Sequence, residues 1–133
     1  MKEILFKAVD KKYKYDGKHK VFRICSIDFI NSEVTIIVDE DRANQEQRKF
    51  HEIEFLQYTG LKDKNGKEIY EGNILEQEDG RRCEVFWNDY NGIFDLRCIV
   101  SKGVPYSLQD RCYLLQEIIG NIYENPELLK DIK

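Results

Sequence analysis

Alternation of apolar and polar residues is the feature that most limits what this 133-residue chain can fold into. In 21–29, 82–87 and 93–100, apolar residues recur at every second position, and 33–38 (EVTIIV) is dense in β-branched residues. Successive side chains of a strand point to opposite faces of a sheet, so a period of two predicts strands rather than helices. The chain is therefore expected to be mainly β.

Turn dipeptides separate these apolar runs. Asn-Gly and Asp-Gly accept the positive φ that tight hairpin turns need, and the chain places such pairs, with one Asn-Ser, between its expected strands. They are Asp16-Gly17, Asn31-Ser32, Asn65-Gly66, Asp79-Gly80 and Asn91-Gly92. Several short strands with regular turns favour a barrel or sandwich over βαβ units. We expect a closed or partly closed small barrel within 57–123.

Two segments do not show this alternation. Segment 39–49 (DEDRANQEQRK) has one apolar residue and cannot bury a face, so we expect an exposed connector. Segment 108–123 fits helical spacing in part, but its second half is rich in β-branched residues, and we favour a strand from about 112 to 123. A short C-terminal helix is expected to follow, because Pro126 suits the first helical position and Asn125 suits the cap.

Two longer stretches resemble signatures of the YopX family. The first is QYTGLKDKNGKEIYEGNIL, from Gln57 to Leu75, and the second is EIIGNIYENPELL, from Glu117 to Leu129. The opening ILFKAVD, from Ile4 to Asp10, is a weaker match. Asn73 stands where the family usually has Asp, which argues against an essential carboxylate at this position.

The resemblance implies a fold and an origin, but no reaction. It implies a mainly β fold with a small SH3-like barrel in the C-terminal half, an N-terminal β portion packed on it, and a bacteriophage or prophage origin. We expect one unit over 1–133 that divides, if at all, into lobes 1–50 and 51–133. The family's molecular role is not established, so the resemblance supplies no catalytic residue.

The charge balance limits the partners that the chain suits. Its net charge is −4 and its isoelectric point is near 5.3, whereas nucleic-acid-binding proteins are usually basic because they neutralise phosphates. Segment 11–23 departs from this balance, since its Lys, His and Arg residues are interleaved with Tyr13 and Tyr15. Basic residues of such a segment can bind a phosphate backbone while bases stack on the tyrosine rings. A run of charged residues is more often a solvated loop between two strands. We therefore keep nucleic acid as the alternative to a protein partner.

No catalytic, metal or cofactor arrangement can be recognised from local spacing. The four cysteines form no C-x-x-C pair, the two histidines have no zinc-ligand spacing, and phosphate-binding glycine motifs are absent. Cys25, Cys83 and Cys98 fall on alternating apolar faces, as inert core residues do, so we expect free thiols. We therefore expect no cofactor, no bound metal and no enzymatic activity. Because no apolar run approaches about 18 residues, we expect a cytoplasmic protein with no membrane partner.

A binding function remains. Trp87, Tyr90 and Phe94 flank the Asn91-Gly92 turn, and Tyr106 lies in another expected loop. Exposed aromatic residues often anchor protein interfaces; alternatively, Trp87 and Phe94 are cross-strand core partners. We predict a non-catalytic module that binds a host or phage protein, with homo-oligomerisation as one form of binding. A weak nucleic-acid-binding protein that uses the basic segment and an enzyme of unidentified chemistry are the alternatives.

Overall fold

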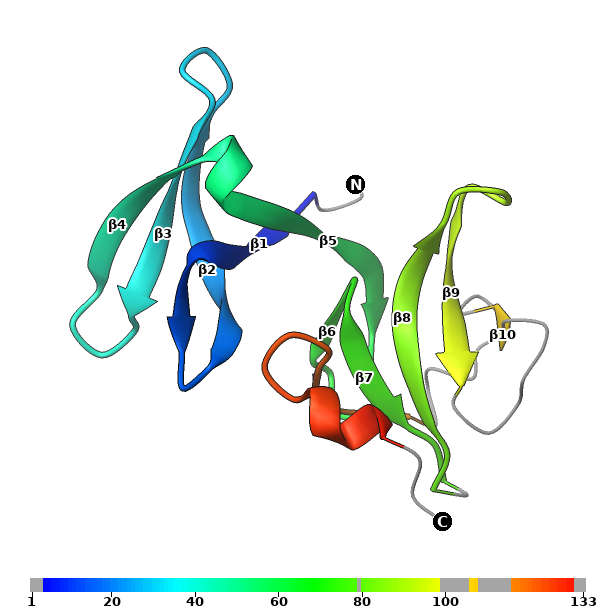
Figure 1. The fold of residues 1–133 in the computed structure, drawn as a ribbon. Helices are drawn as coiled ribbons and strands as arrows, with labels where there is room; N and C mark the ends of the chain where they lie inside the picture. Colours follow the sequence, from blue (N-terminus) through cyan, green and yellow to red (C-terminus); the bar gives the residue numbers. More distant parts are fainter. Residues whose placement is uncertain (1–3, 79, 99–105, 108–115, 131–133) are drawn as a thin grey trace. The chain divides into compact units, whose positions relative to one another are not determined.

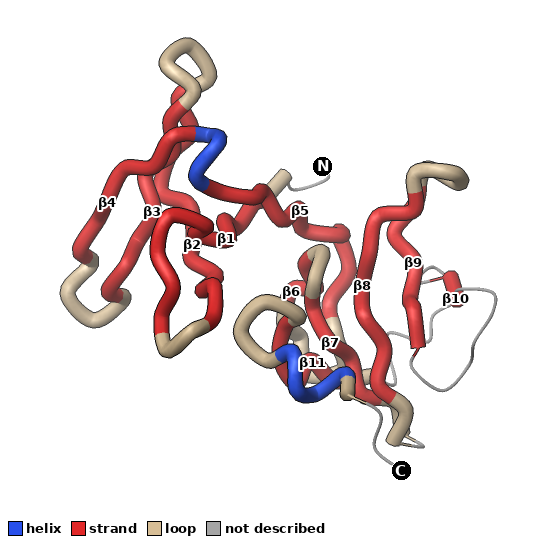
Figure 2. Tube along the Cα trace, in the orientation of Figure 1, coloured by secondary structure: helices blue, strands red, loops and turns tan. Residues whose placement is uncertain are grey.

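The computed structural model describes residues 4–78, 80–98, 106–107 and 116–130 (Figure 1). Nearly all regular structure in these residues is antiparallel β, as the alternation predicts (Figure 2). The chain divides into two compact units, Leu5–Gln57 and Tyr58–Lys133 with Met1–Ile4. The division falls within strand β5 (Ile53–Lys62), whose first half pairs in the N-terminal unit and whose second half pairs in the C-terminal unit.

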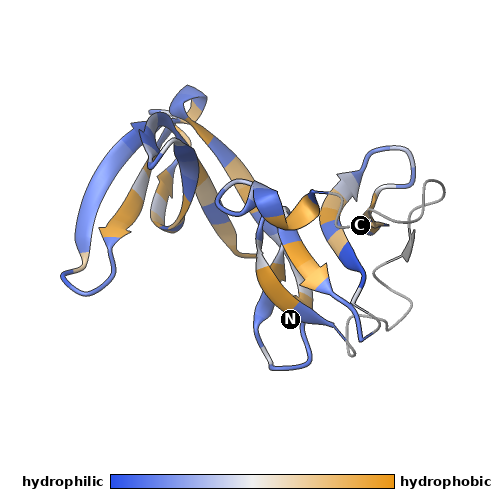
Figure 3. Cartoon of the chain, turned by 60° about the horizontal axis from the view of Figure 1, so that its bottom comes forward, coloured by the Kyte–Doolittle hydropathy of each residue, from blue (hydrophilic) through white to orange (hydrophobic). Residues whose placement is uncertain are grey.

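The N-terminal unit is an antiparallel ladder in the order β4-β3-β2-β1-β5. Its elements are β1 (Phe6–Tyr15), β2 (Lys18–Asp28), β3 (Glu33–Asp39), β4 (Asn44–Lys49), the 3₁₀ turn η1 (Phe50–Glu52) and the first half of β5. The inward faces of these strands bury one apolar core of Ala8, Phe22, Val34, Ile36 and Ile53. In Figure 3, hydrophobic residues lie mainly along strands, while most hairpin loops are hydrophilic.

This ladder curls. Arg48 on β4 forms hydrogen bonds with Asp10 on β1, although β3 and β2 lie between these strands in the ladder. Both side chains are buried. The curl also explains how the three residues of η1 connect β4 to β5 from one side of the ladder to the other.

The C-terminal unit combines a short hairpin with a five-stranded sheet. The hairpin pairs the second half of β5 with β6 (Glu68–Tyr70), and the sheet has the order β10-β9-β8-β7-β11. The sheet strands are β7 (Asn73–Glu76), β8 (Arg82–Asn88), β9 (Ile93–Cys98), β10 (Tyr106–Ser107) and β11 (Glu117–Asn121). One apolar cluster contains Ile69 from the hairpin with Leu75, Val85 and Leu96 from the sheet, so the two layers share a core.

The expected closure of the C-terminal half is not confirmed. Within the described residues, β10 and β11 are the outer strands of the sheet and do not pair with each other. β11 covers 117–121 of the strand expected over 112–123, and 112–115 lie outside the described residues. In place of the expected C-terminal helix there is one 3₁₀ turn, η3 (Pro126–Leu129), and Asn125 occupies its N-cap position without a side-chain cap bond.

Segment 39–49 forms a hairpin instead of the expected connector. β3 ends at Asp39 and β4 begins at Asn44. All residues of β4 except Arg48 are exposed, because β4 is the outer strand of its ladder. Polar residues on such an edge discourage unwanted strand pairing, and they leave no alternation from which the strand can be predicted.

A β-bulge changes the burial of β2. Its pairing with β3 shifts between Ile24 and Ser26, with Cys25 as the extra residue. One extra residue reverses the faces of all residues that follow it. Phe22 and Ile24 before the bulge and Ile27 after it therefore all face the core, whereas Cys25 between them is exposed. The prediction that Cys25 lies on a buried apolar face is wrong.

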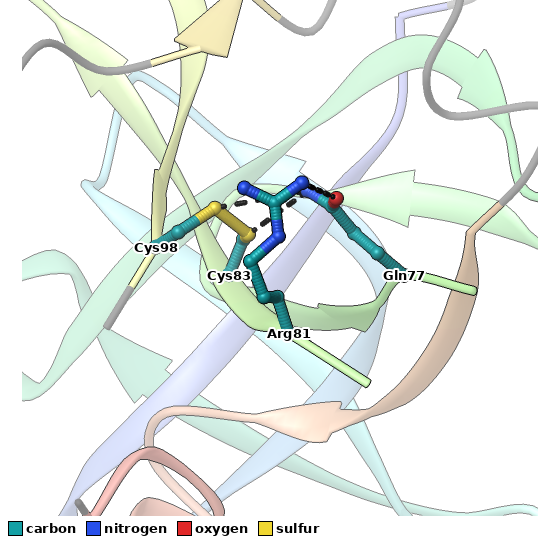
Figure 4. Close-up of a disulfide and its surroundings, with 4 residues drawn as sticks. All are labelled: Gln77, Arg81, Cys83 and Cys98. Atoms are coloured by element: carbon teal, nitrogen blue, oxygen red, sulfur yellow. Dashed lines mark hydrogen bonds between the residues drawn. A yellow bond between two sulfur atoms is a disulfide. The ribbon is translucent and has the colours of Figure 1, made fainter. Parts of the chain in front are cut away.

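Cys83 and Cys98 are joined by a disulfide, so the prediction of free thiols is wrong for this pair (Figure 4). They lie directly opposite each other on β8 and β9, with Cα atoms 4.0 Å apart. Gln77 Nε2 donates to the two sulfur atoms at 3.3 and 3.8 Å, and Arg81 donates to the Gln77 amide oxygen at 2.9 Å. Alternation predicts that both cysteines point into the core, but it does not show that the strand register places them opposite each other.

Candidate interaction surfaces

The structure brings together part of the predicted aromatic surface. Trp87 and Phe94 are cross-strand partners on β8 and β9, with ring centroids 4.9 Å apart and ring planes at 70°. Phe94 packs against the core cluster, whereas Trp87 is 42% exposed and Tyr90, at the hairpin tip, is 95% exposed. Tyr106 lies on β10 opposite Leu96, and its side chain is outside the described part of the structure. The exposed aromatic surface is thus Trp87 and Tyr90.

The Asn88 side chain holds the backbone of the β8–β9 tip that carries Tyr90. Asn88 Oδ1 accepts hydrogen bonds from the backbone N–H groups of Tyr90 and Asn91, at 3.0 and 3.3 Å. The Gly92 N–H donates to the Asn88 carbonyl oxygen at 2.8 Å, and Gly92 has a φ of 66°. A side-chain acceptor before the loop and a left-handed residue at its end shape the turn. Neither feature requires an aromatic residue at position 90.

The β2–β3 tip repeats this construction in the N-terminal unit. Asp28 Oδ1 accepts the N–H groups of Ile30 and Asn31 at 3.0 and 3.1 Å, and Ser32 has a φ of 55°. Phe29 is 75% exposed and Ile30 is 94% exposed. The sequence prediction placed Phe29 on an inward strand face, but β2 ends at Asp28. The signal that was available is a pair of large apolar residues enclosed between Asp28 and an Asn-Ser turn.

The β3–β4 tip has the same backbone and the opposite chemistry. Asp39 Oδ1 accepts the N–H groups of Asp41 and Arg42 at 3.0 and 3.2 Å, and Ala43 has a φ of 55°. The exposed residues of this loop are the charged Glu40, Asp41 and Arg42 and the small Ala43, with no large apolar residue among them. Because this loop type accepts charged residues, the turn does not require the apolar residues of the β2–β3 tip.

The basic segment is an ordered hairpin rather than the solvated loop considered above. Asp16 and Gly17 have φ angles of 53° and 77°, the two positive values of a type I′ turn, and Tyr15 pairs with Lys18 across it. Its five lysines are exposed: Lys11, Lys12, Lys14, Lys18 and Lys20. Together, residues 11–20 form a basic two-stranded ribbon.

The buried Asp10 carboxylate fixes the base of this ribbon. It accepts hydrogen bonds from Arg48 Nε and Nη2 at 3.2 and 3.1 Å, from the Lys12 N–H at 3.0 Å and from the Tyr15 hydroxyl at 3.1 Å. Burial acts to raise the pKa of Asp10, but these donors and the Arg48 charge outweigh burial and hold the pKa below its ordinary value. Burial, followed by the bond to Asp10, raises the pKa of Tyr15. Both carboxylate oxygens of Asp10 thus have donors within the protein, and Asp10 has a structural role.

Asp63 is a second buried carboxylate with a lowered pKa. Its oxygens accept the backbone N–H groups of Asn65, Lys67 and Ile118, at 2.9, 2.9 and 3.0 Å. Burial acts to raise its pKa, and the three donors outweigh that effect. These bonds tie the β5–β6 turn to β11, which explains the Asp63-Lys64-Asn65-Gly66 sequence by hairpin structure.

Among the residues that the structure describes, no group of three His, Cys, Asp or Glu side chains is placed to hold a metal ion. His19 Nδ1 lies 3.1 Å from the Asp10 carbonyl oxygen. No helix in the described part of the chain is both long enough and apolar enough to cross a membrane.

Comparison with known proteins identifies the family. The model of the YopX family, described as YopX protein, matches residues 6–130. The chain belongs to the YopX family. Among solved structures, it is similar to protein EF1440 from Enterococcus faecalis, with a TM-score of 0.59 and 29% identity over 96% of this chain and 99% of that chain. It also matches YopX from Bacillus subtilis, with a TM-score of 0.48 and 23% identity over 100% of both chains.

The comparisons support the fold and name no activity. The likeness to EF1440 spans nearly the whole of both chains, so the β architecture of this chain is similar to that of EF1440. No curated protein matches this sequence. Neither of the two structural neighbours has a name that states a ligand, a reaction or a partner. The function of this YopX chain must therefore be argued from its own surfaces.

Proposed function

We propose that this chain is a phage- or prophage-encoded accessory protein that acts in the bacterial cytoplasm by binding another protein, without catalysis. The observation that carries the proposal is the exposure of large apolar side chains at two hairpin tips, Trp87 and Tyr90 in one unit and Phe29 and Ile30 in the other. Exposed aromatic residues of this kind anchor protein interfaces.

The construction of the tips supports this proposal. All three tips use an Asx side chain and a residue with positive φ, and one of them, the β3–β4 tip, exposes no large apolar residue. The apolar residues therefore do not serve the turn. Because exposing them to water is unfavourable, their placement is explained by a surface that another protein covers.

Two buried carboxylates and the disulfide also favour a non-catalytic role. Catalytic carboxylates need access to a substrate and a pKa suited to proton transfer. Asp10 and Asp63 instead have lowered pKa values because arginine or backbone N–H donors occupy their oxygens. Cys83 and Cys98 bond to each other, which removes both as nucleophiles.

A relation of the C-terminal unit to small SH3-like barrels is part of the proposal. Ile69 on β6 and Leu61 on β5 pack into the same apolar cluster as the strands of the five-stranded sheet. Two short antiparallel layers around one core are the arrangement that such barrels use.

The test is affinity capture with the tagged full chain from a culture with an induced prophage. We compare the parent with Tyr90→Ser and with Asp89→Ser, a matched control in the same exposed loop. The expected result is one bacterial or phage protein recovered by the parent and the control, and reduced several-fold by Tyr90→Ser. Equal recovery by all three forms would contradict this surface. Sedimentation of the purified chain shows whether the captured protein is a second copy.

A further inference from the structure

We infer that the β1–β2 ribbon, residues 11–20, is a second binding site that contacts the phosphate backbone of duplex nucleic acid. This site lies on different residues from the apolar tips. The inference therefore goes beyond the proposed protein-binding function and does not rest on it.

The first observation is that the ribbon extends beyond its neighbouring strands. On one side, the pairing of β1 with β5 ends at Asp10 and Ile53. On the other side, the pairing of β2 with β3 ends at Arg23 and Ile37. Among the described residues, 11–20 thus have no strand neighbour apart from the ribbon itself. A projecting two-stranded β-ribbon has the width that a duplex major groove admits.

The second observation is charge. Residues 11–20 contain five lysines and one acidic residue, Asp16, in a chain whose net charge is −4. All five lysines are exposed. Positive charge is thus concentrated on this projecting ribbon, and neutralising phosphates with lysine is the main source of sequence-independent affinity for nucleic acid.

The third observation is that the ribbon is held in one conformation. The Asp10 carboxylate binds the Lys12 N–H and the Tyr15 hydroxyl, and His19 Nδ1 lies within hydrogen-bond distance of the Asp10 carbonyl. Arg48, buried beneath the ribbon, places its guanidinium 5.3 Å from the centre of the Tyr13 ring. Tyr13 is 50% exposed. A ribbon ordered before binding loses less conformational entropy when it binds.

These features favour a duplex over a membrane. Tyr13 is the one large hydrophobic residue among 11–20 that is strongly exposed, so the ribbon has little apolar surface to insert into lipid. The acidic remainder of the chain opposes association with any polyanion, so we expect weak binding. The expected dissociation constant lies at about 10⁻⁶ to 10⁻⁴ M at physiological salt.

The experiment titrates the full chain into a fluorescent 20-base-pair DNA duplex, with the matching single strand and anionic lipid vesicles as further probes. With about four phosphate contacts, affinity for the duplex should fall on the order of 100-fold between 50 and 200 mM salt. The variant Lys14→Glu, Lys18→Glu should bind at least tenfold more weakly and have a shallower salt dependence, because it removes phosphate contacts.

The control is Lys62→Glu, Lys130→Glu, which changes the net charge equally at exposed positions of the C-terminal unit. It should retain most of the affinity. Melting of both variants at the parent temperature would show that they are folded. The inference is overturned by undetectable duplex binding at 50 mM salt, by equal losses in the two variants, or by tighter binding to vesicles or the single strand than to the duplex.

Discussion

The two units tie their strands together with different chemistry. In the N-terminal unit, the buried pair of Asp10 and Arg48 joins β1 to β4 across the curled ladder. In the C-terminal unit, a disulfide between Cys83 and Cys98 joins adjacent strands inside an apolar cluster. The first tie depends on ionisation and the second on redox state. Acid and reductant should therefore act on different halves of one small chain.

Breaking the ionic tie should have the largest effect. Asp10→Asn removes the buried counter-charge of Arg48 and leaves its ion pair with the half-exposed Glu46. Breaking a buried ion pair costs about 3–5 kcal/mol. Hydrogen exchange should accelerate in β1 to β4, while the fluorescence of Trp87, the one tryptophan and a residue of the C-terminal unit, changes little. The double variant Asp10→Asn, Arg48→Met removes both charges and should recover part of the loss. Equal exchange in parent and Asp10→Asn would contradict the proposed tie.

The same tie predicts a dependence on acid. The folded-state pKa of Asp10 is lowered, so its contribution to stability is fully present above the unfolded pKa of about 4 and is lost as the pH falls through the folded value. Exchange in β1 to β4 should therefore accelerate on acidification, and Asp10→Asn should lack this step. Asp63 has a lowered pKa in the other unit and should retain its own acid response in that variant.

Reducing the covalent tie should have the next largest effect, confined to the other unit. The disulfide closes a loop with a sequence separation of 15, for which the chain-entropy model gives about 3 kcal/mol. Reductant should lower the denaturant midpoint reported by Trp87 fluorescence. The variant Cys83→Ala, Cys98→Ala should be insensitive to reductant. A parent chain that yields the same number of reactive thiols in denaturant before and after reduction would show that the bond does not form in solution.

Both ties lie beyond what the sequence alone predicts. Alternation correctly assigns Cys83 and Cys98 to strands and to the core, yet a bond between them depends on the register of β8 against β9. The Asp10–Arg48 contact spans 38 positions and requires the curl of the ladder. Local pattern reading describes single strands, whereas register and curl are properties of several strands together.

Local sequence patterns also predict the exposed surfaces only in part. Turn dipeptides locate the hairpins other than β3–β4, and the I′ turn at Asp16-Gly17 follows from them. The exposure of Phe29 does not follow from the turn dipeptides, because an apolar residue next to an alternating strand is predicted to continue that strand. Likewise, the bulge at Cys25 places Ile27 on the core side of β2 with Ile24, although alternation predicts that Ile27 shares a face with Cys25. The resemblance of 57–75 and 117–129 to the YopX family predicts the mainly β fold that the structure shows, and it supplies no site residue.

Glycine substitutions in the C-terminal unit should have smaller effects. Gly66 and Gly72 have φ angles of 81° and 88°, which β-branched residues resist, so Gly66→Val and Gly72→Val should each cost about 1–3 kcal/mol. Gly72→Val should cost more, because an added Cβ would lie 3.0 Å from the Tyr123 ring, whereas open space surrounds Gly66. Thermal melting of both variants tests the order. Gly66→Asn is the control, since Asn tolerates positive φ; melting of Gly66→Val like the parent would refute the turn assignment.

Substitutions at the hairpin tips should change stability least. Comparing their effects on stability and on partner capture tests whether the apolar tip residues serve binding. The variant Phe29→Ser, Ile30→Ser keeps the Asp28 side chain and its two backbone bonds, and Glu40→Ser, Asp41→Ser keeps the equivalent bonds of Asp39.

Both substitutions fall on exposed loops of one backbone type, so each should change the free energy of unfolding by less than about 0.5 kcal/mol. Partner capture or self-association should fall only with the first, because only that tip offers apolar surface to a partner. Suppose instead that Phe29→Ser, Ile30→Ser melts well below the parent while the charged-tip variant does not. The contact of the Phe29 ring with Phe50, at 6.0 Å between centroids, would then be part of the core, and the β2–β3 tip would no longer count as a binding surface.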